Sequence, residues 1–375
     1  METTTSAAPG VPRLRRTLTL WDLIFYGIVL IQPIAPVPLY GVAQKLSDGH
    51  FVTIILIALF AMLITAVSYG RMGTLYPTAG SAYTYVGKGL NPHLGFLAGW
   101  AMILDYLLQP LINTVWISTA LHERYVQQVP FMVWALLIAG IMTVLNLIGV
   151  KASARANKVL LGIMSVVVVA FVVLALKYLY GGQGWAGLFS LQPLYNPKTF
   201  DSHKILTATS FAALTYIGFD GVTTLAEDVE NPKRNVLPKK FFGKLKPGTS
   251  TPTNNILLIG GLSFVGAVLL DRIGSAYQHA GELLNFGAFL AFMGVNFACF
   301  WQFSVISKKT GKKRRLVRDA ILPIMGFLFC LVIWINLNII AKTVGGIWFA
   351  IGILYVGYKT NWFRSAPVMI DFSDN

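Results

Sequence analysis

Apolar runs close to twenty residues long recur along almost the whole chain, and short polar segments separate them. Because a helix of about 20 apolar residues crosses the core of a bilayer, each run is a candidate membrane span. We expect ten spans, at roughly 20–43, 51–70, 93–119, 131–150, 157–179, 205–227, 254–271, 281–306, 319–340 and 343–358. The pattern predicts an all-α integral membrane protein.

Two of these spans are interrupted. The first holds Gly27, Pro33, Pro36, Pro38 and Gly41, and the sixth holds Gly218-Phe219-Asp220-Gly221. Irregular backbone is tolerated at membrane depth only where it lines a cavity or packs against protein. A pair of such breaks, one in each half of the chain, indicates the substrate site of a transporter. We therefore predict substrate binding by Ile31, Gln32, Pro33, Ile34 and Ala35 and by Tyr216, Ile217, Gly218, Phe219 and Asp220.

The two ends of a broken helix favour opposite charges. Free N–H groups favour a carboxylate, and free C=O groups favour an ammonium group. An amino acid carries both charges and a polyamine only the second. The breaks alone therefore leave both substrate classes open.

Acidic residues are scarce, fifteen in all, and two of them lie well away from the ends of spans: Asp105 in the middle of span three and Asp220 in the break of span six. A carboxylate at the bilayer centre costs about 2.5–3.5 kcal/mol, so a partner or a wet cavity is expected. Either acid could meet a substrate ammonium or carry a coupling proton. The alternatives are a hydrogen bond between helices for Asp105 and a helix cap for Asp220. The rings of Tyr106, Phe211, Tyr216 and Phe219 could offer cation–π faces, although plain packing explains each alone.

Composition and charge fit this picture: 55% of residues are hydrophobic, 12% are charged, and mean hydropathy is +0.64. With the N-terminus in the cytoplasm, only seven of the 30 Lys and Arg residues fall outside, which leaves 23 inside. This positive-inside bias explains the net charge of +15 without a nucleic-acid partner. We expect a multi-pass protein of the cytoplasmic (inner) membrane with both termini in the cytoplasm and no signal peptide. Anionic lipid could meet the basic run 308–318, although a topological charge is the favoured interpretation.

Motifs of soluble enzymes are missing from the sequence. It has no Gly-rich phosphate loop with Lys-Ser/Thr, no His-Glu-x-x-His and no nucleophile elbow. The two cysteines, Cys299 and Cys330, lie inside apolar spans, and the five histidines have no metal-ligand spacing. We expect no catalytic activity, no metal and no cofactor.

Several blocks of residues, in order along the chain, resemble the amino acid–polyamine–organocation permeases, and most closely their putrescine-importer-like branch. These blocks are Ser47-Asp48-Gly49-His50, Gly80-Ser81-Ala82-Tyr83-Thr84-Tyr85, Asn91-Pro92-His93, Leu104-Asp105-Tyr106, Gly218-Phe219-Asp220-Gly221-Val222-Thr223-Thr224-Leu225 and Leu284-Asn285-Phe286-Gly287-Ala288. The resemblance implies a secondary transporter with the inverted-repeat fold of leucine-type transporters. It also implies a substrate site between the broken first and sixth helices, and import driven by a proton or sodium gradient.

The chain departs from this family after Asn231-Pro232-Lys233-Arg234, where the stretch that would hold helices seven and eight is missing. Relative to the family, we expect a cytoplasmic tail (1–19), a transmembrane domain (20–360) and a second tail (361–375). Within the domain we expect a first repeat (20–180), an incomplete second repeat (205–306) and two further helices (319–358). A complete five-plus-five repeat is the disfavoured alternative.

The functional expectation is a secondary active transporter that imports an amino acid or a polyamine by alternating access. The expected coupling ion is a proton, and sodium is disfavoured because the eighth helix contributes to sodium sites in the family. The alternative is a truncated, non-transporting permease-like protein. The sequence does not determine the oligomeric state.

Overall fold

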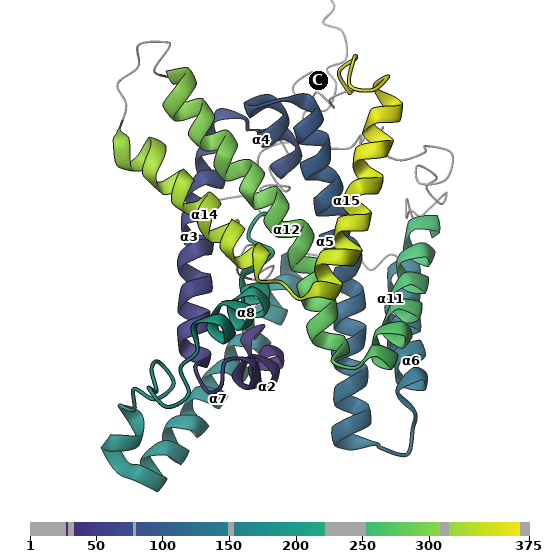
Figure 1. Ribbon diagram of the computed structural model, residues 1–375. Coiled ribbons are helices and arrows are strands. Elements are labelled where there is room, and N and C mark those ends of the chain that lie inside the picture. Colours follow the sequence, from purple (N-terminus) through teal and green to yellow (C-terminus); the bar gives the residue numbers. More distant parts are fainter. Residues whose placement is uncertain are drawn as a thin grey trace, which may run out of the picture.

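The computed structural model describes residues 28, 34–77, 80–148, 154–221, 253–307 and 315–367. Every regular element among these residues is a helix (Figure 1). The α-helices are α2 (Pro36–Leu46), α3 (Phe51–Leu75), α4 (Ser81–Gly89), α5 (Pro92–Ala120), α6 (Phe131–Ile148), α7 (Ala154–Leu188), α8 (Ser202–Ala212), α11 (Thr253–Ile273), α12 (Ala276–Phe300), α14 (Leu322–Ile335) and α15 (Ile339–Lys359). Short turns extend some of them: the π-helical η1 (Leu121–Tyr125), η4 (Trp301–Ile306) and η5 (Val317–Ile321) and the 3₁₀ turn η2 (Ala213–Tyr216).

Among the described residues, seven helices are long and apolar enough to cross a membrane, and they confirm seven of the ten predicted spans. They are Phe51–Leu75, Pro92–Tyr125, Leu161–Gly182, Asn254–Ile273, Ala276–Ile306, Val317–Ile335 and Ile339–Lys359. The fourth predicted span is the shorter apolar helix α6. The first and sixth spans lie only partly within the described residues, as α2 and as α8 with η2.

Helix α12 forms the centre of the bundle. It packs against α3, α4, α5, α14 and α15, and 72% of its most apolar stretch is buried. The approach to α5 is close, because a Cβ atom added to Gly287 would lie 2.3 Å from the carbonyl oxygen of Ala101. Small residues allow such contacts between membrane helices. The backbones of α5 and α12 are therefore in close contact at the centre of the bundle.

Helix α4 lies deeper than a surface helix. The stretch 71–93 is too polar to span a membrane, which predicts an amphipathic or re-entrant segment at the cytoplasmic face. The structure packs α4 between α5 and α12, with Ala82, Tyr85 and Val86 buried. A Cβ atom on Gly95 of α5 would lie 2.4 Å from the Cα atom of Gly87. The re-entrant alternative fits this placement better than the interfacial one.

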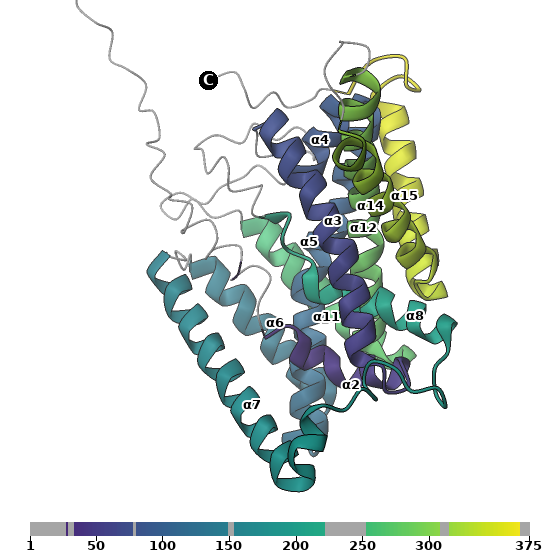
Figure 2. The ribbon, with the colours of Figure 1, turned by 90° about the vertical axis from the view of Figure 1, so that its left-hand side faces the viewer.

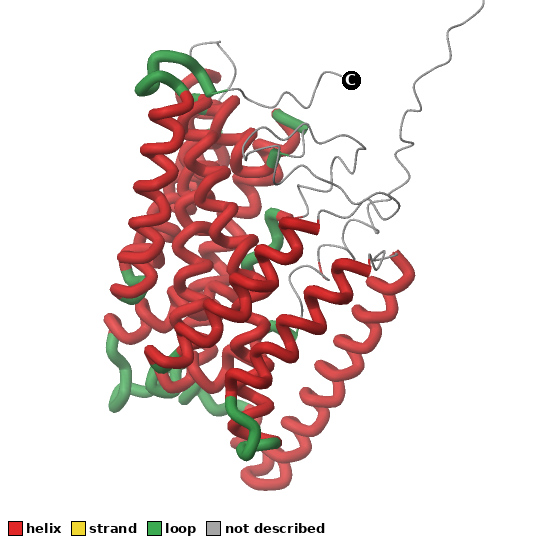
Figure 3. Tube along the Cα trace, turned by 90° about the vertical axis from the view of Figure 1, so that its right-hand side faces the viewer, coloured by secondary structure: helices red, strands yellow, loops and turns green. Residues whose placement is uncertain are grey.

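Helix α7 leans away from the bundle (Figures 2 and 3). Its apolar stretch Leu161–Gly182 has no part buried within the protein, and it makes no extensive contact with another described helix. The helix bends near its end at Gly184, where φ is +56°. Lipid is the only apolar surrounding that the described residues leave for it.

A buried ion pair joins α3 to the start of the α14 segment. One guanidinium nitrogen of Arg71, Nη2, lies 2.5 Å from Oδ1 of Asp319, and the two side chains are 8% and 12% exposed. The other nitrogen donates to the carbonyl oxygen of Arg318, and the guanidinium carbon lies 3.8 Å from the centre of the Phe303 ring. These contacts bind three segments together at one end of the bundle.

Candidate functional site

The break in span six is a real change of backbone conformation. Helix α8 begins at Asp201, whose carboxylate accepts hydrogen bonds from the backbone N–H groups of His203 (2.8 Å) and Lys204 (3.3 Å). It tightens into η2, and Ile217 then becomes extended (φ −67°, ψ 141°). Gly218 follows with φ +114°, a conformation that glycine adopts far more easily than other residues. The helix therefore ends at the predicted break.

Two buried carboxylates meet at this break. Asp220 is 1% exposed, and its Oδ2 accepts a hydrogen bond of 3.0 Å from the hydroxyl of Tyr106 on α5. Asp105, the preceding residue on α5, is 3% exposed and is near enough to Asp220 for their charges to interact. Two such carboxylates repel each other unless a cation or a proton lies with them. The arrangement therefore favours a positively charged guest.

Aromatic rings surround the break on one side. The ring of Phe219 lies 5.3 Å from that of Tyr69 on α3 and 5.2 Å from that of Phe292 on α12. Tyr69 also contacts Tyr85 of α4 edge-on, with ring centres 5.8 Å apart. The sequence analysis did not single out Tyr69, Tyr85 or Phe292. A signal for Tyr69 was available, because Ser68-Tyr69 is a polar pair inside an apolar span.

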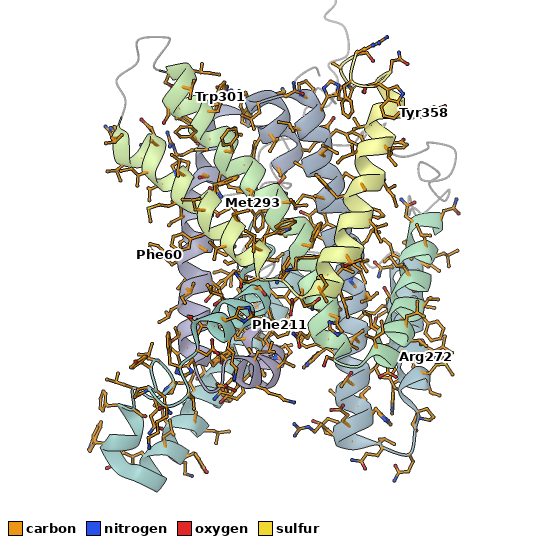
Figure 4. All side chains as sticks on the ribbon, viewed as in Figure 1. Phe60, Phe211, Arg272, Met293, Trp301 and Tyr358 are labelled. Carbon is orange, nitrogen blue, oxygen red and sulfur yellow. The ribbon has the colours of Figure 1, made fainter. Side chains whose placement is uncertain are left out.

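The other predicted aromatic residues have different surroundings. The hydroxyl of Tyr216 donates to the carbonyl oxygen of Ile55 (3.2 Å), so this side chain fastens the break to α3. Phe211 is fully buried and packs edge-on against Tyr277. Figure 4 shows Phe211 inside the bundle, whereas Phe60 and Tyr358 project from its surface. In this structure Phe211 serves packing, and Tyr106 is the half-exposed ring beside the acids.

Span one reaches the same region. Ile31, Gln32 and Pro33 lie outside the described residues, whereas Ile34 and Ala35 form the turn into α2, with the Val37 N–H group donating to the Ile34 carbonyl oxygen (3.0 Å). Helix α2 then packs against α8 in one apolar cluster that contains Leu39, Ala43, Ile205, Ala208, Phe211 and Ala212. The two broken segments are therefore neighbours, as the sequence predicts.

Asn285 of α12 holds α8, the first half of span six, in place. Its side chain is fully buried, and Nδ2 donates to the carbonyl oxygen of Ser210 at 2.5 Å. Ser210 lies two residues before the end of α8, so the bond fixes the helix just before its break. The sequence analysis quoted Asn285 within a family block but gave it no role. A buried amide inside an apolar span was the available signal.

Comparisons with known proteins identify similar sequences. The family model for amino acid permeases matches residues 37–239, which is more than half of the chain. The low-affinity putrescine importer PlaP of Escherichia coli K12 is 28% identical over 94% of this chain and 95% of its own length. The mitochondrial cationic amino acid transporter 3 of Arabidopsis thaliana is 28% identical over 74% of this chain and 49% of its own. The branched-chain amino acid permease BcaP of Bacillus subtilis is 24% identical over 76% and 64%.

The alignment with the putrescine importer also bears on length. It spans 441 positions, which exceeds the 375 residues of this chain by 66. At least that many positions of the relative have no counterpart here. All three relatives are named as transporters, and none as an enzyme.

Proposed function

Because the chain belongs to the amino acid permease family, we propose that it imports an amino acid or a polyamine across the cytoplasmic membrane as a secondary active transporter. The protein is a multi-pass membrane protein and not an enzyme. The distribution of Lys and Arg supports an orientation with both termini in the cytoplasm. With that orientation, the break in span six lies between the two aqueous compartments.

The observation that carries the proposal is the pair of buried acids at the break. Asp105 and Asp220 are both almost fully buried, and Tyr106 holds the Asp220 carboxylate by a hydrogen bond. An ammonium group of the substrate would lie between them, where its charge offsets their repulsion. A diamine would gain most from this arrangement, since it carries no carboxylate of its own.

Transport would follow from movement of the broken helices. Gly218 interrupts helix six two residues before Asp220, and α8, a helix of 11 residues, would move as a short rigid unit on the outer side. We expect the first and sixth helices to rock against α5 and α6, which exposes the acids to each side in turn. A proton on one carboxylate would couple the movement to the proton gradient.

The test is uptake of radiolabelled putrescine, and of a mixed amino-acid panel, into proteoliposomes with an imposed proton gradient. Asp105→Asn removes one charge with little change in shape, and we expect it to abolish diamine uptake while membrane insertion stays intact. Asp271→Asn, at the exposed end of α11, is the matched control and should transport normally. Unchanged diamine uptake in Asp105→Asn would remove this residue from the site.

A second function has its own supporting observations. The alignment with the putrescine importer is at least 66 positions longer than this chain, and α7 has no extensive contact with another described helix. Both observations favour a permease-like protein that lacks two helices and does not transport. The same uptake assay separates the two functions when the chain is measured beside a version with helices seven and eight restored from a relative. Uptake by the restored version alone would support the non-transporting form.

A further inference from the structure

A set of contacts fastens the loop before α8 to the turn between α2 and α3. The backbone N–H of Asn196 donates to Nε2 of His50 (3.1 Å), and the hydroxyl of Thr53 donates to the carbonyl oxygen of Leu194. Nζ of Lys204, in the first turn of α8, lies 2.5 Å from Oδ2 of Asp48. These partners are more than 140 residues apart in sequence. They lie at the end of the bundle that holds α2 and α8, opposite the end that holds α4 (Figure 1).

The hydrogen bonds of His50 determine its protonation state. Nε2 accepts from the Asn196 N–H group, so it carries no proton, and Nδ1 must then donate to the carbonyl oxygen of Ser47 (2.9 Å). The ring is fully buried and has the edge of Phe200 against it, with ring centres 5.6 Å apart. A second proton on Nε2 would point at the Asn196 N–H group, so two donors would face each other without water. Protonated His50 is therefore incompatible with the attached loop.

The fastened segments belong to both broken spans. His50 follows the outer end of α2, and the loop 189–201 leads directly into α8, the outer part of span six. We propose that His50 is a positioning residue of the transporter: its neutral ring holds the outer halves of spans one and six together, and protonation from the outer side releases them. Imidazole is the side chain that, when unperturbed, changes its charge between about pH 5 and pH 8. The consequence for transport rests on the proposed function.

The contacts of His50, Thr53 and Asp48 form a latch between the α2–α3 turn and the segment that leads into α8. Other charged groups near this latch do not respond to pH in the same way. The segments around His50 carry Lys45 and Asp48 before it, Tyr195 and Lys198 in the loop, and Asp201, His203 and Lys204 at the start of α8. The hydrogen bond that the Lys204 ammonium donates to the Asp48 carboxylate raises the pKa of Lys204 above its ordinary value of 10.5, so this cation persists throughout the range. His203 is the other imidazole on these segments, and its side chain is exposed. It provides a matched control.

The first test follows the loop and does not require transport. In His50→Gln the side-chain oxygen can accept the Asn196 N–H bond at any pH, so the latch stays closed. We measure amide hydrogen exchange of residues 189–201 in this variant and in the unchanged chain at the same pH, because intrinsic exchange rates then cancel. At about pH 5.5 the loop of the unchanged chain should exchange about two- to tenfold faster than that of His50→Gln, the worth of one hydrogen bond. At about pH 7.5 the two proteins should agree.

His50→Asn keeps a shorter amide acceptor and replaces His50→Gln in the test if that variant does not fold. His203→Gln is the control and should exchange like the unchanged chain. Equal exchange in His50→Gln and the unchanged chain at both pH values would overturn the proposal.

The second test measures putrescine counterflow at equal pH on both sides, which removes the driving force. Counterflow should be faster at the acidic pH in the unchanged chain and in His203→Gln, and this pH response should be smaller in His50→Gln. Absence of transport in every protein would count against the proposed function, while the hydrogen-exchange result would still decide the role of His50. An equal pH response of counterflow in His50→Gln and in the unchanged chain would overturn the coupling to transport.

Discussion

The ion pair between Arg71 and Asp319 allows a stability prediction with a defined magnitude. Removing the cation by Arg71→Met leaves the Asp319 carboxylate, 12% exposed, without its charged partner. Breaking a buried pair in this way costs about 3–5 kcal/mol. The backbone N–H of Arg315 still donates to Oδ2 of Asp319 at 2.7 Å, so we expect the lower end, about 3 kcal/mol. The variant also loses the contacts of the guanidinium with Arg318 and Phe303.

The second ion pair of the described residues is the matched control. Lys204 and Asp48 are also 2.5 Å apart, but their side chains are 52% and 39% exposed. Exposed pairs contribute about 0–1 kcal/mol, so Lys204→Met should cost little. The assay is thermal unfolding of the purified protein in detergent. At about 2 °C per kcal/mol for a large chain, Arg71→Met should lower the midpoint by about 6 °C and Lys204→Met by about 2 °C or less.

A double variant separates charge from packing. Arg71→Met combined with Asp319→Leu removes both charges and fills the space with apolar atoms, and such replacements are often neutral or stabilising. The double variant should therefore be more stable than Arg71→Met alone. Equal midpoints for Arg71→Met and Lys204→Met would refute the argument that burial decides the strength of the pair.

Three further predictions follow from the described contacts. Asn285→Ala should leave the carbonyl oxygen of Ser210 without its side-chain donor, and the lost hydrogen bond should cost about 1–3 kcal/mol of stability. The variant should also have a higher KM for uptake, because α8 is no longer fixed before its break. Gly287→Ala should lower the unfolding midpoint by an amount that corresponds to about 1–3 kcal/mol, because its Cβ would lie 2.3 Å from the Ala101 carbonyl oxygen. Gly346→Ala is the control and should leave the midpoint unchanged, because no atom lies within 4 Å of a Cβ added there. The backbone N–H groups of the first turn of α8 hold the pKa of Asp201 below its ordinary value of 3.8, so the charged cap stabilises that turn above this value and is lost as pH falls through the lowered pKa. The protection of these amides, measured relative to their intrinsic exchange rates, should fall in acid, and Asp201→Asn, whose oxygen caps without titrating, should remove this loss of protection.

Much of the fold could be predicted because length and hydropathy determine a membrane span. Seven spans were confirmed as helices of sufficient length and apolarity. The break in span six lies at Gly218, and the backbone preference of glycine was enough to predict its position. The end of span nine was predicted wrongly at 340. Asn336 ends α14 by bonding back to the Val332 carbonyl oxygen, and Asn338 caps α15, so two polar side chains divide an apolar run.

The partners of the candidate site could not be predicted, because they come from distant parts of the chain. Asp105 and Asp220 were identified as buried acids, but only the fold brings Tyr106 to Asp220 and Phe292 to Phe219. The latch at His50 depends on a backbone N–H group of Asn196, and a backbone donor leaves no trace in side-chain patterns. Helix α4 was difficult for a related reason, since its small residues permit burial that its polarity does not indicate.

The isolation of α7 has a consequence for how the sequence can change over evolutionary time. Its apolar stretch has a hydropathy of 2.4 with no part buried in the protein, whereas that of α12 has 1.8 with 72% buried. Lipid tails accept any apolar side chain equally well, so α7 can exchange Val, Ile, Leu and Phe freely and is constrained only against charge. Residues of α12 such as Asn285 and Gly287 are constrained by specific neighbours. Among descendants of this chain, we expect α7 to diverge fastest in residue identity while its mean hydropathy stays constant.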